Sequence, residues 1–308
     1  MADRAAAYSY RMWGFGEGAA LLGILRTGEA LSRRDLIDKV ADLVVPTLAQ
    51  GPQPTDHLIA VEVLHELTRL RPAIDVRPLV ERFVHAIMGA PRPLAGRPQV
   101  HRPDLCGLSS TVWVDCLHTD VPGLMLAGEC AASVAVAEEA CAALQDESGL
   151  FSHGFDINTG QANDVHWGRG QGWAMHGLSW GRRCQALDAR LNRLVRALLR
   201  FEEDGAWHTV VDNPNSPREN SVSALVASGL FVASRIRPTD RTWLSLAGRA
   251  LSRAIGALDA HAGLPVSAAT PVGNEGVYLE REIGTFPWGQ GPLLLALLEL
   301  KKGPRNED

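Results

Sequence analysis

The chain has 308 residues, of which 46% are hydrophobic and 21% are charged, a composition typical of a globular protein. A formal net charge of -5 and the lack of a dense Lys/Arg cluster argue against a nucleic-acid partner. The sequence contains neither a membrane-spanning apolar stretch nor the apolar core of a secretory signal. Its five cysteines lack C-x-x-C spacing, which favours reduced thiols and a cytoplasmic protein.

Two kinds of helical segment alternate along the chain. Six segments start with a turn and continue as a helix that is apolar on most sides, and they begin near Trp13, Asp56, Trp113, Trp167, Asn220 and Trp288. Amphipathic stretches lie between them at residues 34–48, 76–88, 130–144, 187–201 and 241–258. Three of the apolar segments start with Trp-Gly-x-Gly, which indicates one architectural unit used repeatedly. Strand signals are limited to Trp207–Val211 and Val277–Tyr278.

This alternation predicts an all-α fold. Helices that are apolar all round need burial on most faces, whereas amphipathic helices need cover on one, so six repeats predict an inner ring within an outer ring. The expected fold is an (α/α)6 toroid that forms a single domain over residues 1–308. The last repeat stops at Lys301-Lys302-Gly303-Pro304, so we expect a terminal outer helix to be missing. The resulting open flank is a surface that a homodimer could cover.

The inner helices of such a toroid begin at one end of the barrel, where their preceding loops form a funnel. Asp115 is flanked by apolar residues at the start of the third inner helix. A buried carboxyl group there is either a helix cap or a general acid with a raised pKa. Asp56 precedes an apolar run in the same way. It is a helix cap or, across a sugar-sized gap from Asp115, a second catalytic carboxylate.

A loop before the fourth inner helix contains His153, Asp156, Asp164 and His166. Their spacing matches no standard zinc pattern, so the sequence predicts no metal and no cofactor. Hydrogen bonding of His153 and Asp156 to sugar hydroxyl groups is the favoured interpretation.

Arg169 starts the next helix, where it could bind a substrate carboxylate through two hydrogen bonds or form a buried ion pair. Tryptophan side chains near these inner-helix starts can stack on sugar rings or form plain core. They are Trp13, Trp113, Trp167, Trp173 and Trp288.

The segments 150–156 and 167–173 together resemble the unsaturated glucuronyl and rhamnogalacturonyl hydrolases, glycoside hydrolase families 88 and 105. Their motifs are a His-Gly-(Trp/Phe)-Asp loop and a Trp-Ala-Arg-Gly-(Asn/Gln)-(Gly/Ala)-Trp helix start. Segment 113–117 with Pro122, the pair Asp56-His57 and segment 13–18 resemble other motifs of these families in the same order. The family fold is an (α/α)6 barrel, as the alternation of helices predicts.

The resemblance implies hydration of the C4=C5 double bond that polysaccharide lyases leave on a terminal uronic acid. Asp115 would protonate C4, and Asp56 would hold ring hydroxyl groups and tune Asp115. The implied partner is an unsaturated uronyl oligosaccharide. The residues expected to bind it are His153, Trp167, Arg169, Trp173, Asp156, Trp13, His101 and Gln171. Around His101 and Gln171 the sequence departs from the usual family pattern, which leaves the leaving-group sugar open.

Two rival functions fit the same residues. A sugar epimerase or isomerase on the same toroid would use an acid/base pair of histidines such as His153 and His101. A non-catalytic carbohydrate-binding protein would use the funnel without reaction.

Overall fold

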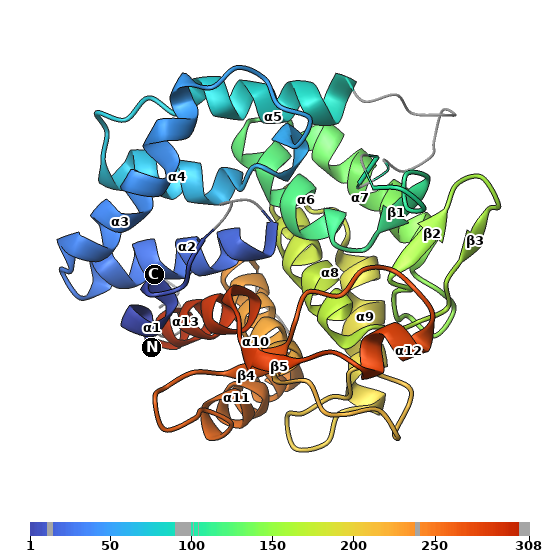
Figure 1. The fold of residues 1–308 in the computed structure, drawn as a ribbon. Helices are drawn as coiled ribbons and strands as arrows, with labels where there is room; N and C mark the ends of the chain where they lie inside the picture. Colours follow the sequence, from blue (N-terminus) through green and yellow to red (C-terminus); the bar gives the residue numbers. More distant parts are fainter. Residues whose placement is uncertain (11–14, 90–99, 101, 104, 238–240, 302–308) are drawn as a thin grey trace.

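The computed structural model describes residues 1–10, 15–89, 100, 102–103, 105–237 and 241–301. An inner ring of helices surrounds the centre of the molecule (Figure 1). These inner helices are α2 (Phe15–Ala30), α4 (Val61–Leu70), α6 (Cys116–Leu126), α8 (Gly168–Gly181), α10 (Asn220–Ile236) and α13 (Pro287–Lys301). Each contacts the next in this order, and α13 packs back against α2, which closes the ring.

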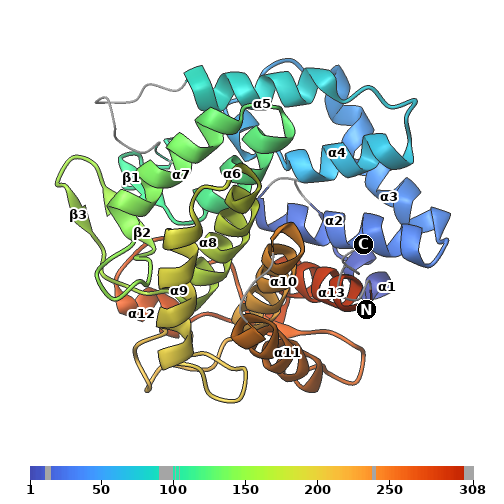
Figure 2. The same cartoon turned by 180° about the vertical axis from the view of Figure 1, so that it is seen from behind.

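Outside this ring lie five helices of eleven or more residues among those described. Figure 2 shows α9 beside α8 and α11 beside α10. The outer helices are α3 (Arg34–Val44), α5 (Arg77–Gly89), α7 (Cys130–Leu144), α9 (Asp188–Arg200) and α11 (Arg241–Gly256). The (α/α)6 toroid expected from the sequence is therefore confirmed. In the described part of the chain, the sixth outer position holds only the short helix α1 (Ala2–Ala6), which contacts α2, α3 and α13.

Burial explains the two kinds of helix. Every residue of α8 is buried, as an inner helix surrounded by neighbours requires. Helix α9 instead buries one stripe, formed by Leu191, Leu194, Val195, Ala197 and Leu198, and turns its arginines outward. Neither pattern needs strong helix propensity, because burial of the apolar face supplies most of the stabilisation.

Glycines allow the inner helices to approach one another closely. A Cβ atom at Gly177 in α8 would overlap the carbonyl oxygen of Leu117 in α6. A Cβ atom at Gly291 in α13 would likewise overlap the backbone nitrogen of Ala20 in α2. Gly291 is the last residue of the third Trp-Gly-x-Gly segment, so at this position the repeat has a packing reason.

Short strands lie in the connecting segments. One antiparallel sheet has the order β1 (Thr111–Trp113), β2 (Gly154–Asp156), β3 (Gln161–Ala162), and a second pairs β4 (Pro265–Ser267) with β5 (Ile283–Thr285). The remaining short helices are η1 (Val45–Ala49), η2 (Asp56–Leu58), η3 (Arg182–Cys184) and α12 (Glu275–Leu279). The five cysteines are free. No helix in the described ranges is long and apolar enough to span a membrane.

The structure corrects three local predictions. Val277 and Tyr278 lie in helix α12 rather than in a strand, because a run of two apolar residues has no period that would define a strand. Segment 207–211 forms only isolated bridges, at His208 and Val210. The second inner helix begins at Val61, after the separate 3-10 turn η2 that contains Asp56.

Candidate active site

Strand pairing brings Asp115 and His153 together. β1 and β2 are antiparallel with Trp113 opposite Gly154, and the backbone N–H of Val114 donates to the carbonyl of His153 at 2.9 Å. The residues that follow β1 and precede β2 are therefore neighbours. His153 Nε2 lies 3.0 Å from Asp115 Oδ2, and the two side chains are 0% and 2% exposed. Asp115 occupies the N-cap position of α6 but makes no side-chain capping bond, so the helix-cap interpretation is wrong.

A chain of hydrogen bonds orients the His153 ring. The Tyr278 hydroxyl lies 2.8 Å from His153 Nδ1, on the other side of the ring from Asp115. Asn163 Nδ2 and the backbone N–H of Gly273 both donate to the Tyr278 oxygen, at 3.1 and 3.3 Å. The single hydroxyl proton of Tyr278 is thus left for His153 Nδ1.

This network decides which ring nitrogen carries the proton. With Nδ1 accepting from Tyr278, the neutral imidazole has its proton on Nε2 and donates it to Asp115 Oδ2. No hydrogen bond joins the other carboxyl oxygen, Asp115 Oδ1, to any residue that the structure describes. Oδ1 is therefore the atom of Asp115 that can exchange a proton with a ligand.

Aromatic rings enclose the His153 imidazole. The ring of Trp167 lies 4.4 Å away between centroids, and the rings of Tyr278 and Trp113 approach edge-on at 5.5 and 5.6 Å. The Nε1 atom of Trp167 is buried and has no hydrogen-bond partner among the described residues. A buried donor without an acceptor is uncommon in folded proteins, so this indole N–H can serve a bound molecule.

Arg169 is held mainly by oxygens of the chain itself. Its guanidinium donates to the Ser221 hydroxyl at 3.1 Å and to the carbonyls of Ser267 and Ala268 at 2.6 and 3.3 Å, and it lies 3.7 Å from Glu219. Burial lowers the pKa of Arg169 to about 10, against the opposing effect of Glu219 and Asp115. These contacts favour the buried ion pair over direct binding of a substrate carboxylate by Arg169.

Glu219 completes this cluster. Its carboxylate accepts from the backbone N–H and hydroxyl of Ser221 and from the N–H of Ser267, so it caps α10 and joins it to β4. The Arg169 guanidinium lies over the rings of Trp167 and Trp288, 4.9 and 5.3 Å from their centroids. The positive charge of Arg169 thus lies against the ring of Trp167, whose centroid is 4.4 Å from that of the His153 ring.

Asp56 is paired with Arg82 of α5. Its carboxylate accepts two bonds from the Arg82 guanidinium, one of them at 2.9 Å, and one from the backbone N–H of Gln53 at 2.9 Å. Asp56 is 5% exposed and lines an open cavity of about 890 Å³ with His57 and His85. No contact between Asp56 and Asp115 is present in the described residues.

Other predicted binding residues hold the local structure. Gln171 accepts from the backbone N–H of Phe151 at 2.8 Å and donates to its carbonyl at 2.7 Å. Asp156 accepts the backbone N–H groups of the turn after β2. Trp173 packs against the ring of His118 at 4.3 Å. The predicted residues Trp13 and His101 lie outside the described residues.

Sequence reasoning missed two residues of this site. Asn163 and Tyr278 lie in segments without a motif. Tyr278 contacts Asn163 and His153, and both contacts span more than a hundred positions of the sequence. Only the tertiary structure could reveal them.

In the part of the chain that is described, no group of three or more His, Cys, Asp or Glu side chains could hold a metal ion. His166 lies between Asp146 and Asp212, at 2.9 and 2.7 Å.

Comparison with known families matches residues 3–303 to the model of Glycosyl Hydrolase Family 88. This chain belongs to that family. Among characterised proteins, the unsaturated rhamnogalacturonyl hydrolase YesR of Bacillus subtilis is 28% identical over 176 residues. The match covers 52% of this chain and 48% of YesR, so the chain spans about half the length of that relative.

Solved structures agree on the fold of this family 88 chain. A possible GH105 member from Salmonella enterica serovar Paratyphi A superposes with a TM-score of 0.80 and 21% identity, over 94% of this chain and 83% of that one. The unsaturated glucuronyl hydrolase of Bacillus sp. GL1 gives a TM-score of 0.73 and 18% identity, over 93% and 86% of the two chains. At these identities the likeness concerns the fold.

Proposed function

We propose that this protein removes a terminal 4,5-unsaturated uronic acid from oligosaccharides by adding water across the C4=C5 double bond. The main support is the buried pair of Asp115 and His153, with Nε2 and Oδ2 3.0 Å apart and Oδ1 left for a ligand. Membership of family 88 supports the same reaction class. The oligosaccharides would be those that polysaccharide lyases release.

The proposed reaction starts with a proton on Oδ1 of Asp115. Oδ1 gives this proton to C4, and a water molecule adds its hydroxyl group to C5 and returns a proton to the carboxylate. The product is a hemiketal at C5, which opens to a ketone. The resulting hemiacetal at C1 then expels the leaving-group alcohol, so that one water is consumed for each glycosidic bond broken.

The surroundings of Asp115 suggest how the ring would be bound. Trp167 offers a buried N–H without an acceptor among the described residues and a ring face beside His153. The charge of Arg169, which lies against the Trp167 ring, favours the uronate carboxylate in a site of low dielectric constant, without direct contact. We also keep Asp56 as a proposed second carboxylate, which would contact substrate from the cavity that it lines with His57 and His85.

An ultraviolet assay tests this function. Unsaturated disaccharides from pectin, hyaluronan, chondroitin and ulvan would be mixed with the protein, and loss of the enol-ether absorbance followed. We expect decay on at least one of them, and a loss of about 10³-fold in kcat for Asp115→Asn. Asp42→Asn, which changes an exposed carboxylate on α3, is the matched control and should act like the wild type. Stable absorbance with all four substrates would contradict the proposal.

Two further proposals concern the setting of the protein. Free cysteines fit a reducing compartment, and we keep the cytoplasm as the proposed location, testable by cell fractionation. The flank that α1 covers between α13 and α3 is the proposed homodimer surface. Light scattering after size-exclusion chromatography would give the mass in solution, and a monomer at high concentration would contradict the dimer.

A further inference from the structure

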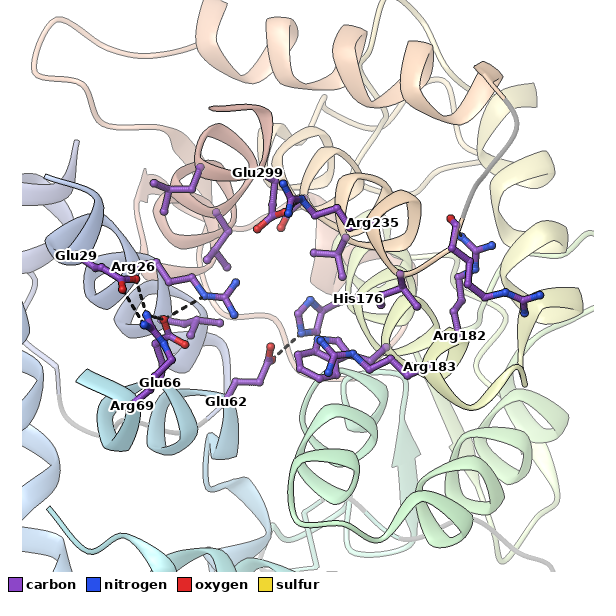
Figure 3. Close-up of a pocket in the computed structure, with 18 of the residues that line it drawn as sticks. Arg26, Glu29, Glu62, Glu66, Arg69, His176, Arg182, Arg183, Arg235 and Glu299 are labelled. Carbon is purple, nitrogen blue, oxygen red and sulfur yellow. Dashed lines mark hydrogen bonds and ion pairs between the residues drawn. The ribbon is translucent and has the colours of Figure 1, made fainter. Parts of the chain in front are cut away.

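A second cavity lies at the opposite end of the barrel from Asp115. Asp115 and Arg169 lie at the starts of inner helices, whereas this cavity, of about 850 Å³, is lined by the later turns of α2, α8, α10 and α13 together with α4 (Figure 3). Its volume is in the range of small-molecule sites. None of the residues proposed above for the hydrolase reaction lines it.

Arginines dominate the lining of this cavity. Six of them face four glutamates: Arg26, Arg69, Arg182, Arg183, Arg235 and Arg237 against Glu29, Glu62, Glu66 and Glu299. Four of the six are held closely by carboxylates. Arg69 pairs with Glu29 and Glu66, Arg235 pairs with Glu299, and Arg182 and Arg237 both pair with Asp188.

Arg26 and Arg183 are the two lining arginines that do not belong to these close pairs. The carboxylate that pairs with Arg26, Glu66, is 3.9 Å away and already accepts a bond from Arg69 at 2.7 Å. Arg183 forms no ion pair with any residue that the structure describes. Its guanidinium instead lies over the ring of Trp180, 4.0 Å from the centroid. Arg183 is an exposed residue at the edge of the cavity, and partial desolvation lowers the pKa of its guanidinium.

The remaining carboxylate near these two arginines is already engaged. Glu62 accepts a bond from His176 Nε2 at 2.7 Å. In Figure 3, Arg26 and Arg183 reach toward Glu62 from its two sides. Counted over the whole cavity, six guanidinium groups face five carboxylates, the four glutamates and Asp188, so one positive charge is in excess. The apolar side chains of Leu22, Trp180 and Leu295 form the adjoining wall.

We propose that this end of the barrel binds a small organic anion, with its carboxylate or other oxyanion group between Arg26 and Arg183. Guanidinium groups form paired, charge-assisted hydrogen bonds with such oxygens. The apolar wall would cover the body of the ligand. This second site shares no residue with the proposed hydrolase site and is independent of that reaction.

The test is calorimetric titration at fixed ionic strength with two probes, inorganic phosphate and D-glucuronate. We expect one site for at least one probe, with binding at least about tenfold weaker in Arg26→Gln and in Arg183→Gln. Arg253→Gln removes the same charge from the exposed face of α11 and should bind like the wild type. Binding of phosphate alone would identify a phosphate-type ligand, and binding of glucuronate alone a carboxylate.

Two results would overturn the second site. One is the absence of binding by both probes in the wild-type protein. The other is binding that survives in both arginine variants, or glucuronate binding that only Asp115→Asn removes, which would place the ligand at the other end of the barrel. Circular dichroism and melting curves of each variant establish that the proteins compared are folded.

Discussion

The hydroxyl group of Tyr278 lies 2.8 Å from Nδ1 of His153, on the far side of the imidazole from Asp115. Tyr278 is 1% exposed and receives two hydrogen bonds, from Asn163 and Gly273. It therefore fixes the tautomer of a ring that bonds the proposed catalytic acid. A segment 125 positions away from His153 thus sets the hydrogen-bonding state of Asp115.

Removal of the Tyr278 hydroxyl should therefore affect turnover. In Tyr278→Phe, His153 Nδ1 loses its donor. We expect kcat to fall roughly tenfold with little change in KM, because Tyr278 acts on Asp115 through His153. The pH profile of kcat should also shift. Tyr10→Phe is the control, since Tyr10 donates to a backbone carbonyl near the N-terminus. An unchanged kcat and pH profile would rule out the positioning role.

The pairing of Asp56 with Arg82 allows two roles of Asp56 to be separated. Asp56→Asn should lower the free energy of unfolding by about 3 kcal/mol, because it leaves the half-buried Arg82 guanidinium without its counter-charge. Urea denaturation measures this loss. Arg82→Gln should give a similar loss. If Asp56 also acts on substrate, kcat falls further in Asp56→Asn than in Arg82→Gln, and equal kcat values would argue for structure alone.

Asp120 predicts a pH dependence of stability. Burial raises its pKa from 3.8 to about 7, against a hydrogen bond from Thr119 that lowers it. The folded chain keeps this proton up to about pH 7 while the unfolded chain loses it near pH 4, so stability falls as the pH rises between these values. Asp120→Asn removes this penalty, which is roughly 2–4 kcal/mol above pH 7.

Melting curves at pH 5 and pH 8 test the role of Asp120. The variant should melt higher than the wild type at pH 8 and show a smaller gain, or none, at pH 5. The same gain at both pH values would mean that ionisation of Asp120 is not its cause.

The close approach of α6 and α8 predicts a strong effect at Gly177. Gly177→Ala would press its Cβ atom into the Leu117 carbonyl, and we expect a loss of about 3 kcal/mol in the free energy of unfolding. Gly248, within α11, has open space around its Cβ position. Gly248→Ala should therefore stabilise the protein by up to about 1 kcal/mol. A Gly177→Ala protein as stable as the wild type would show that the two helices can separate at little cost.

The sequence by itself determined the ring of helices. Apolar periodicity marks the inner helices, and amphipathic stripes mark the outer ones, because each helix must bury the faces that its side chains make apolar. Its motifs also pointed to Asp115 and His153, which strand pairing at the ends of β1 and β2 brings together. These features are local in the chain or repeat at a fixed period, so they can be predicted from the sequence of residues.

Only the tertiary structure decided the partners of these side chains. Arg169 could have clasped a substrate, but Ser221, Ser267 and Glu219, from segments 50 and about 100 positions away, already hold it. Tyr278 had no motif and lies in a short helix where a strand was expected. Hydrogen bonds between distant segments depend on how the helices and strands pack in the folded protein. No periodicity along the sequence encodes that arrangement.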